Sequence, residues 1–260
     1  MKFWGTSLLV FGIGIILGII LFFPWSRLEF VLENYLFQKT GLISKVSKIS
    51  YNWPLGLKIS KIEVYLPEHK MVFTEVKLSP GLFFLKIDGK LAQGSVEAKF
   101  NPLTKRGDLR LKHVQGVKFI WPKAVGKIWL WANFSWPEFK AKGKVIAKDV
   151  SFTFFCPGLR QKISLSQVQI ASLFNLEKNV LFLQKGEVKN PNALISFAGK
   201  IEVEPENLGR SKLRLKAKVI LKRTKGLPSD LNLFLSSFLH KAVFFKVEGK
   251  LERPTLKPQF

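Results

Sequence analysis

Basic and apolar residues alternate strictly between residues 212 and 219, and this two-residue period constrains the fold more than any other feature of the chain. The basic positions are Lys212, Arg214, Lys216 and Lys218, and the apolar positions are Leu213, Leu215, Ala217 and Val219. Successive side chains of a β-strand point to opposite faces of its sheet. The segment is therefore predicted to be a strand with one basic and one apolar face.

The same period recurs along most of the chain, in residues 57–64, 96–100, 109–112 and 243–251. Turn-forming Asn, Pro and Gly residues separate these runs, a spacing typical of an all-β meander. The sequence predicts a mainly β fold, in which residues 42–260 form a long curved antiparallel sheet, either an open groove or a sandwich-like arrangement. Short helices are expected at residues 122–131 and 228–239, because each segment follows a turn signal.

A short motif, Gly-Lys followed by a branched apolar residue, occurs five times, with its glycine at Gly89, Gly126, Gly143, Gly199 and Gly249. A glycine at equivalent points of several strands predicts a repeated bend or bulge. Chance accounts for some copies, since lysine is abundant.

The first 25 residues contain an uncharged, mostly apolar run from Phe3 to Phe23. As a helix this run would be about 30 Å long, which matches the hydrocarbon thickness of a bilayer. We interpret residues 1–25 as an uncleaved transmembrane anchor; a cleaved signal peptide is the alternative, although its apolar region is normally shorter. Gly14 and Gly18 could pack against another helix, or could reflect the general frequency of glycine in membrane helices.

Residues 26–41 follow the predicted anchor and have helical periodicity. Ser26 and Glu29 have the spacing of a capping box, and Gly41 is a typical helix stop. We expect an amphipathic juxtamembrane helix that lies either on lipid headgroups or against the folded domain.

The chain has 42 Lys and Arg residues against 18 Asp and Glu, a net charge of +24. An alternating basic face could contact anionic lipid headgroups. It could instead be a solvated surface without a specific partner. Nucleic-acid binding is not expected, because the charge is spread along strands and forms no recognised nucleic-acid motif. Lys212, Arg214, Lys216 and Lys218 are the candidate anionic-surface contacts.

The sequence contains few residues and none of the common motifs that would support enzymatic catalysis. Cys156 is the single cysteine, and His69, His113 and His240 are far apart in the sequence. No phosphate-binding loop, dinucleotide-binding turn, zinc-protease motif or nucleophile elbow occurs. We therefore predict a non-enzymatic protein with no catalytic, metal-binding or cofactor-binding residues; His113 is expected on the surface, and Cys156 as a buried apolar side chain.

Several short motifs occur in a characteristic order along the chain. They are Phe22-Phe23-Pro24, Lys39-Thr40-Gly41, the run from Trp53 to Ile59, Gly116-Val117-Lys118, the run from Phe139 to Val145, and the run from Val247 to Pro254. In these motifs the chain resembles the N-protein family of the bacterial type II secretion system, in its bitopic form. More distantly, it is similar to AsmA-like envelope proteins.

The resemblance implies a single-pass inner-membrane protein whose β domain lies in the periplasm and serves the secretion apparatus as a non-enzymatic accessory component. Its partners would be the membrane, other envelope or secretion-system proteins and, on the basic face, anionic lipid. The AsmA-like similarity implies an alternative, a lipid-handling β-groove whose apolar strand faces line a lipid path. A fully packed interior without an apolar groove would remove that alternative.

Overall fold

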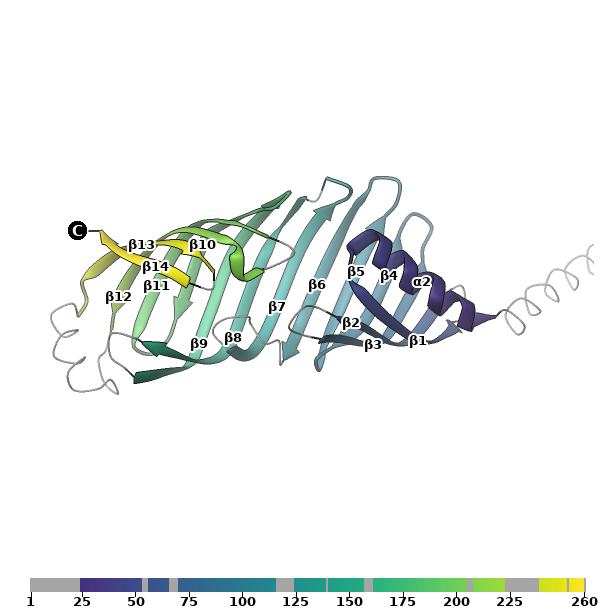
Figure 1. Cartoon of the computed structure of the whole chain (residues 1–260), viewed down its shortest axis with the longest axis horizontal. Helices are drawn as coiled ribbons and strands as arrows, with labels where there is room; N and C mark the ends of the chain where they lie inside the picture. The colour runs from purple at the N-terminus through teal and green to yellow at the C-terminus, as the bar shows by residue number, and fades with distance from the viewer. Residues whose placement is uncertain are drawn as a thin grey trace, which may run out of the picture. The chain divides into compact units, whose positions relative to one another are not determined.

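The structure is a computed structural model that describes residues 24–52, 56–65, 70–115, 124–138, 140–156, 161–204, 208–222, 239–251 and 253–259 (Figure 1). The predicted anchor, with Gly14 and Gly18, lies outside these residues, as does nearly all of the helix expected at 228–239. Within the described ranges α2 is the only α-helix, and it lacks the length and apolar character of a membrane span.

Within the part of the chain that the structure describes, fourteen strands follow α2 and form one open antiparallel sheet, which confirms the mainly β prediction. The strands are hydrogen-bonded in sequence order, β1 to β14, so no crossover occurs. The elements are α2 (Trp25–Thr40), β1 (Ile43–Asn52), β2 (Gly56–Tyr65), β3 (Lys70–Pro80), β4 (Leu85–Leu91), β5 (Gly94–Asn101), β6 (Arg106–Gln115), β7 (Ala124–Ser135), β8 (Lys140–Cys156), β9 (Gln161–Glu177), β10 (Val180–Lys189), β11 (Ala193–Glu202), the 3₁₀ turn η2 (Leu208–Arg210), β12 (Lys212–Leu221), β13 (Ala242–Lys250) and β14 (Arg253–Gln259).

The helix expected at residues 122–131 is wrong, because β7 occupies most of that segment. Lys127, Trp129 and Trp131 pair with Lys148, Ile146 and Lys144 of β8, so they share one face of the sheet. Ile128 and Leu130 lie between them and face the other side. The period is therefore two, and the turn signal before the segment was misleading.

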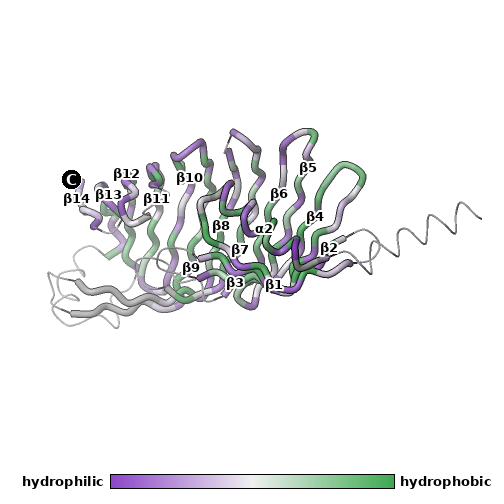
Figure 2. The backbone as a smooth tube through the Cα atoms, turned by 45° about the vertical axis from the view of Figure 1, so that its right-hand side comes forward, coloured by the Kyte–Doolittle hydropathy of each residue, from purple (hydrophilic) through white to green (hydrophobic). Residues whose placement is uncertain are grey.

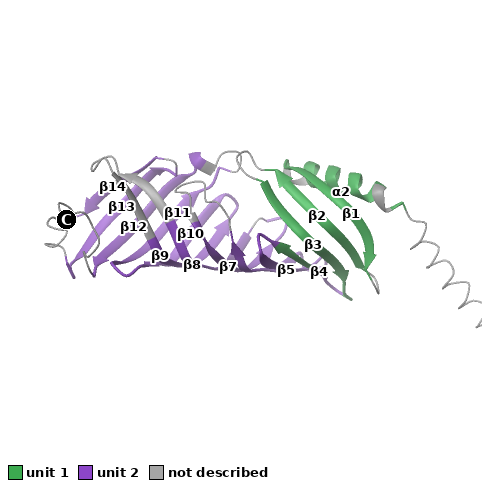
Figure 3. Ribbon diagram, turned by 90° about the horizontal axis from the view of Figure 1, so that it is seen from below, with its two compact units in different colours: residues 1–82, 86–90 green, residues 83–85, 91–260 purple. Residues whose placement is uncertain are grey.

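The chain divides into two compact units, coloured separately in Figure 3. Unit 1 comprises α2, β1 to β3 and residues 86–90 of β4. Its core is a cluster of Val46, Ile49, Ile59 and Val76, against which Leu28 and Leu32 of α2 pack. The helix expected at 26–41 thus lies against the folded domain and covers the apolar side of this part of the sheet.

The ends of α2 confirm one sequence prediction and correct another. Gly41 ends the helix in a left-handed conformation, and its N–H donates to the carbonyl of Phe37 at 2.8 Å. The predicted capping box at Ser26 is wrong, because the N-cap residue is Pro24 and no side chain caps the helix. Glu29 accepts a hydrogen bond from the backbone N–H of Ile49 instead.

Glu29 and Glu33 of α2 both bond to β1, which pairs with β2 on one side and lies at the end of the sheet order. The N–H of Val46 donates to Glu33 Oε1 at 2.6 Å, and the N–H of Ile49 donates to Glu29 Oε1 at 3.2 Å. Unpaired edge-strand amides otherwise invite pairing with another chain. The helix therefore closes part of this edge with carboxylates.

Unit 2 comprises residues 83–85 and 91–260 and contains β5 to β14. Several of its strands carry a polar residue with positive φ in mid-strand: His113 in β6, Asp149 in β8, Gln167 in β9 and Lys185 in β10. A buried residue directly follows each one, namely Val114, Val150, Val168 and Gly186. We call these four polar residues the bend residues of unit 2.

Each bend residue lies at a β-bulge, where the pairing register shifts. In β8, for example, Ala147 and Val150 are both buried although they are three positions apart, a spacing that would place them on opposite faces of a regular strand. The extra residue, Asp149, restores the alternation, so that the apolar side chains stay on one face. The bulges thus explain why strict alternation in the sequence stops at these points.

The recurring Gly-Lys motif lies in β4, β7, β8, β11 and β13. In β8, a Cβ at Gly143 would overlap the carbonyl oxygen of Trp131 and lie 2.8 Å from Ala132 Cα. In β11, Gly199 has a φ of +154°, and a Cβ there would overlap the backbone of Arg214. Gly143 and Gly199 therefore permit close approach of neighbouring strands. At Gly126 the pairing register between β7 and β8 shifts, which is a bulge of the kind that the recurring glycine predicts.

Candidate functional site

One face of the unit 2 sheet is apolar across nine consecutive strands, and we call it the apolar face. In register, one row from β5 to β13 consists of Ala98, Leu109, Ala132, Gly143, Phe174, Leu183, Gly199, Leu215 and Val247. The row two residues away consists of Phe100, Gly107, Phe134, Ala141, Leu176, Leu181, Ile201, Leu213 and Gly249. Neither row contains a polar side chain.

The row between these two belongs to the opposite face, which we call the polar face. It consists of Lys99, Asp108, Asn133, Lys142, Asn175, Phe182, Lys200, Arg214 and Glu248. Figure 2 shows the same alternation as purple and green segments along β10 to β13. The period-two pattern of the sequence thus sorts polar and apolar side chains onto two sides of one sheet.

The apolar face is only half-buried. Of its two rows, Ala132 and Leu213 are buried, whereas the other side chains keep part of their surface accessible. The described residues of unit 2 include no α-helix, and no two non-adjacent strands there make extensive contact. A sandwich would cover such a face with a second sheet about 10 Å away. Among the described residues nothing supplies that second layer.

Stacked rings mark one end of this face. Phe100 and Phe134 lie on either side of Gly107, with parallel rings 6.1 Å apart between centroids. A Cβ at Gly107 would lie 2.5 Å from Cζ of the Phe134 ring. The glycine therefore leaves the space in which the two rings stack, and it keeps the apolar surface continuous.

The four basic residues predicted from the sequence lie together on the polar face of β12, where Lys212, Arg214, Lys216 and Lys218 are all exposed. Arg214 lies 3.8 Å from Glu202, and the Lys218 ammonium lies 5.9 Å from the centroid of the Phe244 ring. Lys212 stands in register with Lys250, which stands in register with Arg253. Like charges directly opposite destabilise a sheet, so this row favours an anionic neighbour.

Carboxylates elsewhere on β11 and β13 are neutralised locally. The Lys200 ammonium, 3.1 Å from Glu202, lowers the pKa of that carboxyl, and Arg214 adds to the effect. Lys246, 2.7 Å from Glu248, lowers the pKa of Glu248 in the same way. Both glutamates therefore stay ionised to lower pH than an ordinary glutamate, and their charge offsets part of the positive charge around them.

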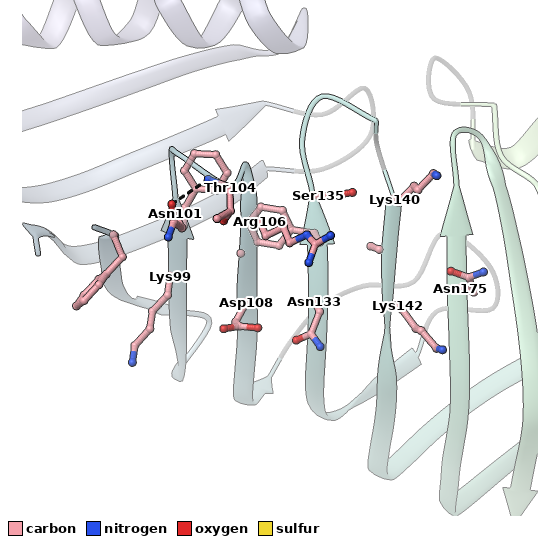
Figure 4. Close-up of a pocket in the computed structure, with 15 residues that line it drawn as sticks. Lys99, Asn101, Thr104, Arg106, Asp108, Asn133, Ser135, Lys140, Lys142 and Asn175 are labelled. Carbon is pink, nitrogen blue, oxygen red and sulfur yellow. Dashed lines mark hydrogen bonds between the residues drawn. The ribbon is translucent and has the colours of Figure 1, made fainter. Parts of the chain in front are cut away.

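A second polar feature lies at the ends of β5 to β9 and is a hollow of about 800 Å³, which we call the strand-end hollow (Figure 4). Its charged side chains are Lys99, Arg106, Lys140, Lys142 and Asp108. Its neutral polar side chains are Asn101, Thr104, Asn133, Ser135 and Asn175, and its apolar lining consists of Phe84, Phe100, Gly107, Phe134 and Ala141. The ion pairs within the described part of the chain include none of these charged residues.

The turn beside the hollow is held by Asn101. Its Oδ1 accepts hydrogen bonds from the backbone N–H groups of Leu103 at 2.9 Å and Thr104 at 3.0 Å. Such a side-chain turn fixes the connection between β5 and β6. It thereby sets Arg106, the first residue of β6, opposite Asn101 at the end of β5.

The histidines are not brought together among the described residues. His113, exposed as expected, lies edge-on to the Trp129 ring at 4.8 Å, while the N–H of His240 donates to the carbonyl of Leu221. His69 lies outside the described residues. Cys156 ends β8. Within the described residues, no three His, Cys, Asp or Glu side chains form a group that could hold a metal ion.

The apolar and polar faces are predictable from the sequence, whereas the strand-end hollow is not. Its residues come from five strands, and their proximity follows from the register of β5 to β9, which a single strand's pattern does not contain. Comparison of the chain with protein-family models, curated proteins and solved structures finds no match.

Proposed function

We propose that the protein binds lipid acyl chains on the apolar face of unit 2. The observation that supports this proposal is the pair of apolar rows from β5 to β13, which stay half-buried while no second layer covers them among the described residues. A soluble monomer rarely exposes a contiguous apolar patch larger than a few hundred Å². An occupant that is itself apolar would remove this surface from water.

An acyl chain fits this surface in shape and chemistry. It has no hydrogen-bonding groups, and the two rows offer none from their side chains. Burial contributes about 0.8 kcal/mol for each CH₂ group, so even partial contact along the rows would give substantial affinity. The apolar run from Phe3 to Phe23 also predicts that the chain resides at a membrane, where such lipids are available.

Acidic substitutions at neighbouring positions of β12 test the proposal, because adjacent residues point to opposite faces. We compare the full chain carrying Leu215→Asp, on the apolar face, with Lys216→Asp, on the polar face. Each protein is purified in a maltoside detergent, and its bound fatty acids are measured by mass spectrometry. Both variants keep residues 1–23, so lipid around the predicted anchor is the same in the two samples.

We expect Leu215→Asp to lose most of the bound lipid that exceeds this common background, because burying a carboxylate against an acyl chain costs several kcal/mol. Lys216→Asp should retain it. Equal lipid content in both variants would refute acyl-chain binding on this face. If Leu215→Asp instead converts a dimer to a monomer and leaves the amount of bound lipid unchanged, the apolar face would be the contact surface for a second copy of the chain.

A role in type II secretion remains a prediction from the resemblance of short motifs alone. It is compatible with lipid binding, since an accessory envelope component could do both. Deletion of the gene, followed by measurement of proteins secreted across the outer membrane, tests it. Unchanged secretion would count against it and would leave the acyl-chain proposal unaffected.

A further inference from the structure

We propose that the strand-end hollow binds a phosphate group through Arg106, Lys140 and Lys142. Most of the residues that line the hollow are polar, and Phe100, Gly107, Phe134 and Ala141, at the end of the second apolar row, also line it. Because the polar side chains would hold the anion, the proposal goes beyond acyl-chain binding and does not depend on it.

The register of the strands gathers donors around β7. Arg106 of β6 and Lys140 of β8 lie on either side of Ser135, in one row across the three strands. Lys142 lies beside Asn133 in the next row. Because neighbouring strands are about 4.8 Å apart, an anion placed over β7 would be within reach of side chains from both neighbours.

Figure 4 shows the Arg106 side chain extending from β6 toward β7, where Ser135 and Asn133 are labelled. A guanidinium presents several N–H donors in a planar fork that matches two phosphate oxygens. The Ser135 hydroxyl and the Asn133 amide add neutral donors on the strand below. Lys140 and Lys142 supply ammonium groups on flexible stems that can turn toward an anion.

The hollow gathers basic side chains that form no ion pair within the described residues. Ion pairs at 2.7 to 3.1 Å neutralise carboxylates on other strands, as between Lys189 and Glu187 or Lys200 and Glu202. The lining of the hollow includes four basic side chains and one carboxylate, that of Asp108, and none of the five forms an ion pair within the described residues. The net positive charge of this lining favours a ligand with more than one negative charge.

Asp108 makes the proposal testable in both directions. It stands in register between Lys99 and Asn133, so its carboxylate borders the place where the phosphate would lie. Removing a repelling charge should strengthen phosphate binding, whereas removing the cations should weaken it. If these side chains had a purely structural role, the two kinds of substitution would not change the phosphate affinity in opposite directions.

The test uses the full chain in a maltoside detergent at low salt, titrated calorimetrically with inorganic phosphate and, separately, with dihexanoyl phosphatidic acid. The site variant carries Arg106→Gln, Lys140→Gln and Lys142→Gln. The control variant carries Lys45→Gln, Lys58→Gln and Lys77→Gln, which remove the same charge from exposed positions of β1, β2 and β3. Asp108→Asn is the third variant.

We expect the site variant to lose at least tenfold in phosphate affinity, the control variant to stay within about twofold, and Asp108→Asn to bind several-fold more tightly. Equal losses in the site and control variants would overturn the proposal in favour of diffuse charge. Absence of binding by the unmodified chain to either probe would also overturn it. Should the site variant not fold, an affinity for Asp108→Asn equal to or below that of the unmodified chain overturns it.

The two probes separate the sources of the phosphate. Equal affinity for inorganic phosphate and the short-chain lipid indicates a free phosphate ligand. Binding of the lipid alone, with loss in the site variant, indicates a lipid headgroup. Either result supports a phosphate site in the hollow.

Discussion

The bend residues offer a sharp test of how the strands of unit 2 are built, and Gln167 of β9 is the cleanest of the four. It is exposed, forms no ion pair within the described residues and has a φ of 55°. The next residue, Val168, is 1% exposed and belongs to a buried cluster with Ala147 and Val150. The left-handed backbone at Gln167 therefore keeps Val168 in the core.

We predict opposite effects for Gln167→Gly and Gln167→Val. The left-handed conformation costs an L-residue about 1–2 kcal/mol, a cost that glycine does not have. Glycine loses about 0.5–1 kcal/mol through the greater freedom of the unfolded chain, so Gln167→Gly should be neutral or stabilising by up to about 1.5 kcal/mol. Valine is β-branched and tolerates positive φ poorly, so Gln167→Val should destabilise by about 2 kcal/mol.

Urea unfolding of the full chain in a maltoside detergent, followed by tryptophan fluorescence, measures these differences. The control is Gln169→Val, two residues along β9, where the side chain is exposed and the backbone has no positive φ. Valine favours strands, so this variant should be as stable as the unmodified chain. A Gln167→Val variant as stable as Gln169→Val would refute the assignment of a left-handed bend at residue 167.

Three further predictions concern single residues. Glu63 accepts hydrogen bonds from Lys61, Lys70 and Tyr65, which lower its pKa from 4.5 to about 2. Its contribution to stability is therefore complete above about pH 5 and is lost as the pH falls toward 2. A Glu63→Gln variant should have a thermal midpoint that depends less on pH across this window, and an unchanged dependence would contradict the prediction. Glu33→Ala should destabilise the chain by about 1–3 kcal/mol in urea unfolding, because it leaves the Val46 N–H without its acceptor. The control, Asn34→Ala, changes the next, exposed residue and should have little effect. Equal effects of the two substitutions would argue against the edge-closing role of Glu33. Gly143→Ala should destabilise the folded chain by roughly 1–3 kcal/mol, because the added methyl group overlaps the β7 backbone. The control, Lys144→Ala, should not destabilise it. A Gly143→Ala variant as stable as the unmodified chain would show that β7 and β8 lie farther apart than in the structure.

The features that are predictable from the sequence are those that depend only on the pattern of a single strand or helix. The alternation at residues 212–219 correctly predicts β12 and the orientation of its four basic residues, because side-chain direction depends only on position along the strand. Gly41 was equally predictable, since a helix stop is a local feature.

Features that depend on partners in other strands were not predictable in this way. The bend residues are His, Asp, Gln and Lys, and none of these residue types signals a left-handed backbone as glycine would. Glu29 fitted a capping box by spacing, yet its partner is Ile49, twenty residues away. The strand-end hollow requires the register of five strands, and turn residues such as Asn101 and Thr104 are the local features that set part of it.

The most direct test of acyl-chain binding is photo-crosslinking along β12 in cells. A benzophenone amino acid is introduced singly at each position from 213 to 217 of the full chain, and crosslinked lipid is identified by mass spectrometry. Because successive side chains point to opposite faces, we predict lipid crosslinks at 213, 215 and 217 and none above background at 214 and 216. Equal crosslinking at all five positions, or crosslinks to protein alone at the odd positions, would contradict lipid binding by the apolar face.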